Sequence, residues 1–222
     1  MTKQYIDPSK IYVWVHTWWK RDDVRKATLA SLDTSDAAGL YHVHRQDESH
    51  CKVHFFIHTM RTICAMEDYD WILRLEDDTL VNKHLIHNVC TWPVPHVEPK
   101  FGMGFLSVSN PVLKDTPHIA YGEKLKTPWR NYKAMHFGGG ILWNRREFQK
   151  RIRRIKKCMC RHVPHLACAV CPSQVFREDG LRSYFHVPSI VKIDLSYARH
   201  VDGKVIGEGV HGTQPFDRDF RR

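Results

Sequence analysis

The chain has 222 residues, a formal net charge of +10 when its sixteen His are counted as neutral, and seven Trp and eight Tyr. This length suits one domain, or two tightly fused ones, with a substantial core, and the aromatic content excludes a disordered chain. The positive charge favours polyanionic partners such as nucleotide diphosphates, nucleic acid or anionic membranes, although a basic surface that serves only solubility is the plainer alternative.

The sequence shows no segment for export or membrane insertion. Residues 1–8 lack the apolar run of a signal peptide, and no apolar run elsewhere approaches the length that spans a bilayer. If the chain is complete, we expect a cytoplasmic protein, in the host cytoplasm if the chain is viral. Seven Cys, an odd number, also argue against a closed disulfide framework.

The first hundred residues alternate between strand and helix patterns. Runs rich in β-branched and aromatic residues predict strands, and apolar residues at helical spacing predict the helices between them. The strands are expected at residues 10–16, 40–44 and 71–75, and the helices at 24–32, 53–66 and 80–92. This alternation predicts a parallel sheet covered by helices on both faces, with ligands bound outside the carboxyl ends of its strands.

The second half of the chain is less regular. Strands are expected at residues 101–108 and 137–143, both of which contain glycines, and residues 110–133 are expected to form a long loop. Residues 145–160 predict a strongly basic helix, and the tail after Gly203 is expected to be weakly ordered.

The third predicted strand runs directly into three carboxylates, those of Glu76, Asp77 and Asp78. Desolvation and mutual repulsion both oppose the ionisation of three neighbouring acids. A cation should therefore lie opposite them, and a divalent metal is the most economical candidate. The alternative is a solvated acidic turn that caps the following helix.

Four segments follow one another in a familiar order: the first strand with residues 25–32 after it, the acidic run WILRLEDD, the glycine strand at 137–143, and residues 180–191. Over about residues 10–195 they resemble glycosyltransferases of the GT-A fold, in which a Rossmann-like sheet ends in a DxD-type acidic motif that holds a divalent cation. The resemblance implies transfer of a hexosyl or related sugar from a nucleotide-sugar, a UDP- or GDP-sugar, to an acceptor hydroxyl. Mn²⁺ or Mg²⁺ would neutralise the departing phosphate as a Lewis acid.

The same resemblance assigns roles to the acids by position. The last acid, Asp78, would be the principal metal ligand, and Glu76 would make a secondary contact with ribose or a metal-bound water. The role of Asp77 stays open, and we group it with the nucleotide-binding residues.

Further nucleotide contacts are expected after the first strand. Thr17 and Trp18 lie where the family places base and ribose, with an indole of Trp18 or Trp19 either stacked on the base or simply packed in the core. Arg21 or Arg25 suits the diphosphate, because guanidinium groups bind phosphate oxygens bidentately. Asp47 lies near where the family often reads uracil or ribose.

Gly138, Gly139 and Gly140 open the later strand. Because glycine has no Cβ atom, they would let the backbone approach the sugar or the acceptor closely. A strained strand entry or a bulge is the alternative, of equal weight.

The chain departs from the family at the catalytic base and at a late metal ligand. Residues 171–176 contain no acid where many inverting members carry one, so Glu178 and Asp179 are the remaining candidates for the base; a turn with Gly180 is their alternative role. A His that the family often uses as a further metal ligand is absent, and Asp194 or His200 would substitute. Inverting and retaining chemistry both stay open.

A cysteine cluster lies between residues 158 and 171 and also contains His162 and His165. Four thiolates, or three with one His, would satisfy a tetrahedral structural Zn²⁺ site. Ordinary buried cysteines are the equally weighted alternative. The four cysteines of the cluster are Cys158, Cys160, Cys168 and Cys171.

The predicted basic helix and the residue just after it carry nine cations in seventeen residues, between Arg145 and Arg161. A solvated helix face is the ordinary explanation, but this density favours a polyanionic acceptor such as DNA with a modified base. Glycan, lipid-linked and protein acceptors compete with it.

We therefore expect one α/β domain of the GT-A type over residues 1–222, with a mostly parallel central sheet flanked by helices. Residues 10–100 would form the nucleotide-binding half and residues 101–200 the acceptor-binding half, which contains the possible zinc insert at 158–171. Two other functions remain: a non-catalytic nucleic-acid-binding module with a zinc knot, and a degenerate transferase fold that serves as a partner subunit.

Overall fold

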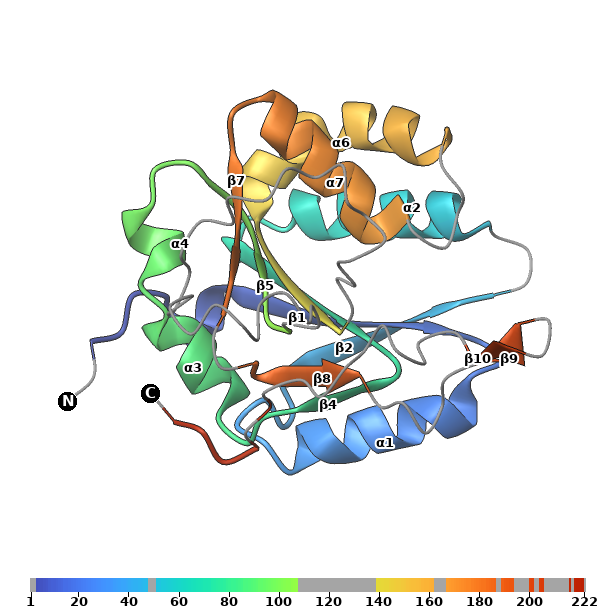
Figure 1. Cartoon of the computed structure of the whole chain (residues 1–222), viewed down its shortest axis with the longest axis vertical. Helices are drawn as coiled ribbons and strands as arrows, with labels where there is room; N and C mark the ends of the chain where they lie inside the picture. Colours follow the sequence, from blue (N-terminus) through green and yellow to red (C-terminus); the bar gives the residue numbers. More distant parts are fainter. Residues whose placement is uncertain are drawn as a thin grey trace.

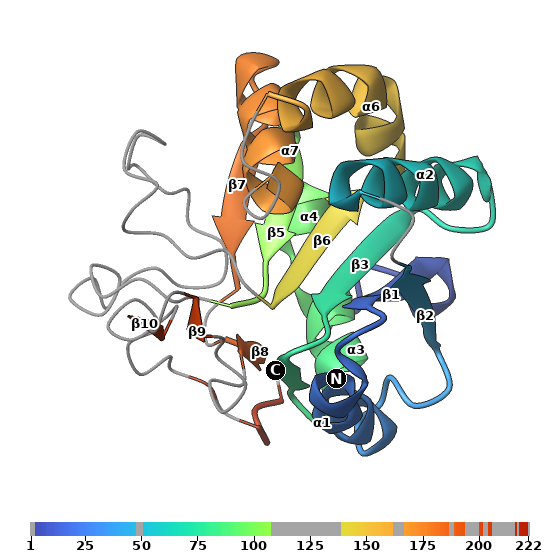
Figure 2. The same ribbon diagram turned by 90° about the vertical axis from the view of Figure 1, so that its right-hand side faces the viewer.

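The computed structural model describes residues 3–47, 51–107, 139–161, 167–186, 189–193, 200–201, 204–205, 216 and 218–221. Its centre is a six-stranded sheet with the strand order β2-β1-β3-β6-β5-β7. The strands are β1 (Ile11–Trp18), β2 (Tyr41–Gln46), β3 (Trp71–Glu76), β5 (Phe101–Phe105), β6 (Gly140–Asn144) and β7 (Arg182–Phe185). All run in one direction except β6, which is antiparallel to both β3 and β5 (Figure 2). The expected mostly parallel α/β sheet is confirmed.

Helices cover both faces of this sheet, as Figure 1 shows. One layer contains α2 (Lys52–Ala65), α6 (Arg145–Met159) and α7 (Ala167–Glu178), and the other contains α1 (Asp22–Asp33), α3 (Leu85–Thr91) and α4 (Val94–Val97). None of the helices in the described ranges combines the length and the hydropathy that a membrane crossing requires.

Two hydrophobic cores result, one on each side of the sheet. In β1, Tyr12 and Trp14 belong to the core under α2, α6 and α7, whereas Val13 and Val15 belong to the core on the opposite side. Successive side chains of a strand point to opposite faces, so a strand buried on both sides is apolar throughout. This is why the sequence of β1 shows no polar alternation.

Two further strand pairs lie outside the main sheet in the described part of the chain. The strand β4 (Thr79–Val81) pairs antiparallel with β8 (Val191–Ile193), and β9 (His200–Val201) pairs with β10 (Lys204–Val205). The 3-10 turn η1 (Pro8–Lys10) precedes β1.

The predicted helix over residues 80–92 is wrong in its first third. Leu80 lies in β4, opposite Lys192 of β8, and the helix α3 begins only at Leu85. The partner strand comes from more than a hundred residues further along the chain, so local helical spacing could not reveal it. The predicted loop at 110–133 lies outside the described residues.

The tail after Gly203 is described only in part. Residues 218–221 return to the side of α1 and α3, where the backbone N–H of Lys83 donates to the carbonyl of Arg218 at 2.9 Å. Asn88 also donates from Nδ2 to the carbonyl of Phe220 at 2.9 Å. This described end of the tail, expected to be weakly ordered, is therefore tied to the second helical layer.

Candidate active site

The carboxyl ends of β1, β2 and β3 meet at one edge of the sheet and surround a cleft of about 470 Å³. The register places His16 of β1 beside Glu76 of β3 and Trp18 beside Gln46 of β2. The cleft is lined by His16, Thr17, Trp18, Arg21, Gln46, Asp47, Lys52, Arg74, Glu76 and Asp77. Parallel sheets bind ligands at this edge, so the position agrees with the expectation from sequence.

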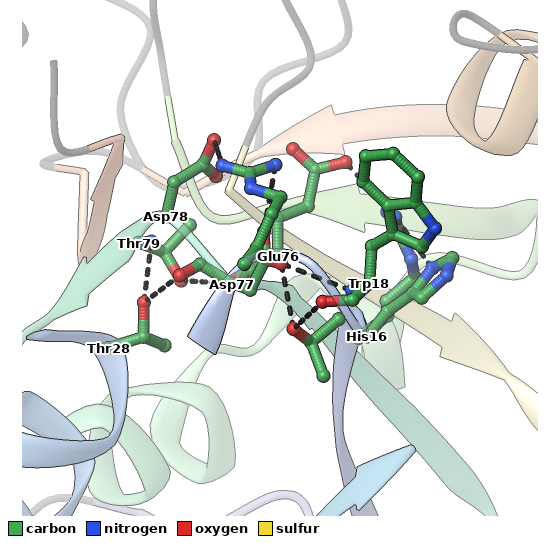
Figure 3. Close-up of polar contacts among 10 residues, drawn as sticks. His16, Trp18, Thr28, Glu76, Asp77, Asp78 and Thr79 are labelled. Carbon is green, nitrogen blue, oxygen red and sulfur yellow. Dashed lines mark hydrogen bonds and ion pairs between the residues drawn. The ribbon is translucent and has the colours of Figure 1, made fainter. Parts of the chain in front are cut away.

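The acid turn that follows β3 is fixed to α1 by hydroxyl groups (Figure 3). Thr28 of α1 donates from Oγ1 to the carbonyl of Asp77 at 2.7 Å and accepts from the backbone N–H of Thr79 at 3.0 Å. Thr79 in turn donates from Oγ1 to the carbonyl of Glu76 at 2.7 Å. Since these groups are buried, their hydrogen bonds hold the backbone of the turn in one conformation.

Asp77 faces inward and is only 3% exposed. Its carboxylate accepts from Thr17 Oγ1 at 2.8 Å and from the backbone N–H of Trp18 at 3.4 Å, and it lies 3.0 Å from Nη1 of Arg21. Burial, together with the neighbouring charge of Glu76, raises the pKa of Asp77 despite the opposite effect of Arg21 and these hydrogen bonds. Asp77 therefore joins the acid turn to the end of β1 and has few remaining contacts to offer a ligand.

Asp78 has an oxygen without a partner. Its Oδ2 binds Nη2 of Arg21 at 2.9 Å, whereas Oδ1 is buried and makes no hydrogen bond with the described residues. Burial, together with the neighbouring charge of Glu76, raises the pKa of Asp78 to about 6 despite the presence of Arg21. The positive charge of Arg21 is therefore not enough to keep the pKa of Asp78 at its ordinary value.

Glu76 is held by a buried arginine, Arg74, which is 3% exposed. Nη2 of Arg74 donates to Oε1 of Glu76 at 3.0 Å, and the guanidinium lies 5.9 Å from the ring centroids of Trp14 and of Phe56. Burial raises the pKa of Glu76, but the charges of Arg74 and Lys52 and the hydrogen bonds of Arg74 and Gly139 lower it, so the net shift is downward. Glu76 is thus an anion whose side chain is still 32% exposed to the cleft.

His16 completes the floor of the cleft. Its Nδ1 lies 3.3 Å from Nη2 of Arg74. Burial, and then the charges of Arg74 and Lys52, hold the pKa of His16 well below its usual value. The imidazole is therefore neutral at physiological pH.

The expectation that a cation lies opposite the acids is met within the chain itself. Arg21 bridges Asp77 and Asp78, and Arg74 pairs with Glu76. Among the described residues, no three His, Cys, Asp or Glu side chains converge as a ready metal site.

The donor set nevertheless suits a hard divalent cation. Such ions bind through one or two carboxylates together with substrate phosphates. Oδ1 of Asp78 and the half-buried carboxylate of Glu76 provide oxygens of this kind. The residues present fit a cation that arrives with a diphosphate better than one held by protein ligands alone.

The structure brings most of the predicted nucleotide residues together. Thr17, Trp18, Arg21, Asp47 and Asp77 line the cleft with Glu76, and Asp78 adjoins them through Arg21. Four lining residues were missed by sequence reasoning: His16, Gln46, Lys52 and Arg74. A signal existed for two of them, because His16 and Arg74 precede Trp18 and Glu76 by two positions and so share their face of the sheet.

Arg25 lies outside the cleft lining. Its guanidinium binds Asp22, one helical turn away in α1, at 3.0 Å. The prediction that Arg25 meets a diphosphate is therefore not supported by its position.

The described glycines of the triple-glycine segment are packed within the fold. A Cβ atom on Gly139, whose φ is +95°, would lie 2.9 Å from Val191 Cγ1, and one on Gly140 would lie 3.0 Å from Val191 Cγ2. The carbonyl of Gly139 also accepts from the backbone N–H of Glu76 at 2.9 Å. These contacts favour the strand-entry alternative; Gly138 lies outside the described residues.

The location of Glu178 and Asp179 does not support the prediction that one of them is the catalytic base. They lie at the end of α7, just before β7 begins, which is the edge of the sheet opposite the acid turn. Arg154 binds Glu178 at 2.8 Å, and Arg151 binds Asp179 at 2.7 Å. Hydrogen bonds from Arg154 and Arg151 lower the pKa of Asp179, which makes it a weaker base.

Among the side chains that the structure describes, the cysteines of the cluster do not gather with other ligands as a metal site, and the zinc site stays a prediction. Cys171 is buried in the core under α6 and α7, Cys160 is exposed, and the thiol of Cys158 donates to Oε1 of Gln174 at 3.7 Å. The side chain of Cys168 lies outside the described part of the chain, as do His162 and His165.

The two late metal candidates are not placed by the structure. Asp194 lies outside the described residues, and only the backbone of His200, in β9, is described. Their assignment stays a prediction.

Comparisons with known proteins concern the fold. The chain matches no protein-family model and no curated protein sequence. It is similar to a solved glycosyltransferase involved in the glycosylation of the major capsid of PBCV-1, with a TM-score of 0.42 and 11% identity over 80% of this chain and 82% of that one.

Two further structures resemble it to the same degree. A cytidylyltransferase from Leptospira borgpetersenii gives a TM-score of 0.45 and 9% identity over 81% of this chain and 76% of that one. The protein A197 from STIV gives a TM-score of 0.46 and 14% identity over 82% of this chain and 83% of that one. All three are likenesses of fold at low sequence identity.

Proposed function

We propose that this chain is a glycosyltransferase that binds a nucleotide-sugar together with a divalent cation in the cleft at the carboxyl edge of its sheet. One observation carries the proposal: the acid turn holds Asp78, whose Oδ1 is buried without a partner among the described residues. Its other oxygen, Oδ2, binds Arg21, which lines a cleft together with Lys52 and Arg74. Acidic and basic side chains next to one another suit a ligand that brings a metal cation for the acids and phosphates for the arginine and lysine groups.

The residues of the cleft divide into two groups by charge. Asp78 and Glu76 would hold Mn²⁺ or Mg²⁺, which when bound neutralises the charge that develops on the departing diphosphate. Arg21 and Lys52 are the cations that can reach phosphate oxygens, since Arg21 is 19% exposed in its side chain and Lys52 lines the cleft.

The nucleoside would occupy the end of the cleft formed by β1 and β2. Trp18 offers an indole face to a base, and Asp47 and Gln46 offer polar groups to base or ribose. Thr17 supports this wall by donating from its hydroxyl to Asp77 at 2.8 Å.

The direct test is turnover of UDP- and GDP-sugars by the purified chain, followed as release of the nucleoside diphosphate with and without Mn²⁺. We expect metal-dependent release by the wild type and loss of at least about a hundredfold in Asp78→Asn, the scale seen when one stabilising group is removed. Glu178→Gln is the matched control, because it removes an acid at the opposite edge, and it should turn over normally. Release that is equal in wild type and Asp78→Asn would refute the proposal.

A further inference from the structure

The helix α6 carries a straight row of cations on its outer face. Arg146, Lys150, Arg153 and Lys157 are all exposed and recur at intervals of four, three and four residues, so they lie along one side of the helix. At a rise of 1.5 Å per residue, the row spans about 16 Å. We call these four residues the cationic row.

The opposite side of the same helix faces the core. Phe148, Ile155 and Met159 are buried beneath it, in the core shared with α2 and α7. The cationic row therefore points away from the protein, and α6 lies at the outer margin of its layer (Figure 1).

Most of the row lacks internal counter-charges. Arg151 and Arg154, on the flank of the helix, bind Glu147, Glu178 and Asp179, and Lys150 binds Glu147 at 2.6 Å. Arg146, Arg153 and Lys157 make no ion pair or hydrogen bond with any residue that the structure describes. Glu147, Glu178 and Asp179 are thus bound by the flank and by Lys150, and the three other cations of the row are not paired with any described acid, although Glu67 lines a hollow beside Arg146 and Lys150.

We propose that the cationic row binds the phosphodiester backbone of duplex nucleic acid. A duplex carries one phosphate per about 1.7 Å of axis when both strands are counted, so a duplex segment as long as the row carries about nine phosphates. Four cations over this length provide the charge that releases counterions from such a backbone. The inference does not depend on the transferase activity of the cleft.

Two other occupants fit the surface less well. Protein interfaces place aromatic or large apolar side chains at their centre, and the exposed large apolar residues of the described chain, Leu40, Val43 and Val97, all lie outside α6. Membrane-surface helices insert an apolar face, but the apolar face of α6 is occupied by the protein core.

The test is fluorescence anisotropy of a labelled duplex of about 20 base pairs, titrated with the full chain at several NaCl concentrations. The variant Arg146→Gln/Arg153→Gln/Lys157→Gln removes the unpaired cations of the row. We expect it to weaken binding by about tenfold or more and to reduce the slope of log K against log salt by about 2 to 3, since each phosphate contact contributes about 0.9.

A second triple variant controls for net charge. Lys10→Gln/Lys26→Gln/Lys100→Gln removes three exposed cations that lie elsewhere, and it should retain the wild-type affinity and slope. An equal loss in both variants would mean that net charge alone attracts DNA and would overturn the proposal. Absence of duplex binding by the wild type would overturn it as well, as would binding to phosphatidylserine vesicles in preference to DNA.

Discussion

Nη2 of Arg21 lies 2.9 Å from Oδ2 of Asp78, the residue whose other oxygen is buried without a partner. Arg21 comes from the loop between β1 and α1, and Asp78 belongs to the acid turn after β3. The pair therefore joins that loop to the acid turn. The same guanidinium binds Asp77 at 3.0 Å. Arg21 thus occupies the position where a divalent cation would be attracted, and the two cations should compete.

Replacing Arg21 with Met tests this competition. Without the guanidinium, the acids carry excess negative charge, and the affinity for Mn²⁺ alone should rise by about tenfold. A tenfold change corresponds to about 1.4 kcal/mol, which is less than the interaction energy of two unit charges near a protein surface, about 4 kcal/mol. Electron paramagnetic resonance of free Mn²⁺ measures this directly.

The matched control for Arg21 is Arg154→Met. Arg154 also binds two acids, but its side chain is 49% exposed and lies at the opposite edge of the sheet. Mn²⁺ affinity should not change in this variant. A lower Mn²⁺ affinity in Arg21→Met than in wild type would contradict the competition.

The stability of the protein should respond to His16 as pH falls. The folded pKa of His16 lies well below 6.5, whereas the unfolded chain takes up a proton at about 6.5. Below that pH the unfolded state binds more protons, so this group lowers the free energy of unfolding by up to about 1.4 kcal/mol per pH unit as the solution becomes more acidic.

Denaturant unfolding between pH 7.5 and pH 5 measures this dependence. His16→Asn should flatten the dependence, whereas His58→Asn, on the exposed face of α2, should leave it as in wild type. If wild type and His16→Asn lose stability in parallel, His16 is not the neutral buried group described above.

The hydroxyl of Thr28 should be important for the geometry of the acid turn. Thr28→Val keeps the shape of the side chain but leaves the carbonyl of Asp77 and the N–H of Thr79 without their partner. We expect a loss of about 1–3 kcal/mol in the free energy of unfolding, because both groups are buried.

Thr34→Val is the control for Thr28, since Thr34 makes similar hydrogen bonds at the exposed end of the same helix. It should cost less than about 0.5 kcal/mol. Equal effects of the two variants in urea unfolding would show that the Thr28 hydroxyl has no special role in holding the turn.

Gly139 should tolerate a side chain less well than Gly180, although both have positive φ. A Cβ at Gly139 would lie 2.9 Å from Val191 Cγ1, whereas one at Gly180 would meet nothing within 4 Å. Backbone strain of about 1 kcal/mol is common to both Ala variants, so the difference in their unfolding free energies reports the steric clash. We expect Gly139→Ala to be the less stable by about 1–3 kcal/mol. Equal losses of unfolding free energy in the two variants would show that Val191 of β8 moves aside without cost.

The sequence was sufficient for the elements whose signals are local. The apolar run of β1, the helical spacing in α2 and the acids after β3 each predicted their element and its place within a few residues. It failed where a partner distant in the chain decides the structure. Leu80 forms a strand because β8 pairs with it, and Glu178 binds Arg154 of α6, which comes more than twenty residues earlier in the chain.

The candidate site shows the same division. The acid turn and the segment around Trp18 were found because their residue types are conspicuous, and the rule for parallel sheets then placed them at one edge. Arg74 was missed because it lies within an apolar strand, where only its register beside Trp14 and its position two residues before Glu76 show that it faces the cleft. The counter-charges of the acids therefore had to be learned from the structure.

The most direct test of the central claim is calorimetric titration of UDP and GDP into the wild type and Asp78→Asn, each with and without Mn²⁺. If Asp78 holds a cation against a diphosphate, Mn²⁺ should strengthen nucleotide binding to the wild type by at least about tenfold and have no effect on the variant. Binding that Mn²⁺ strengthens equally in both proteins, or in neither, would contradict the account.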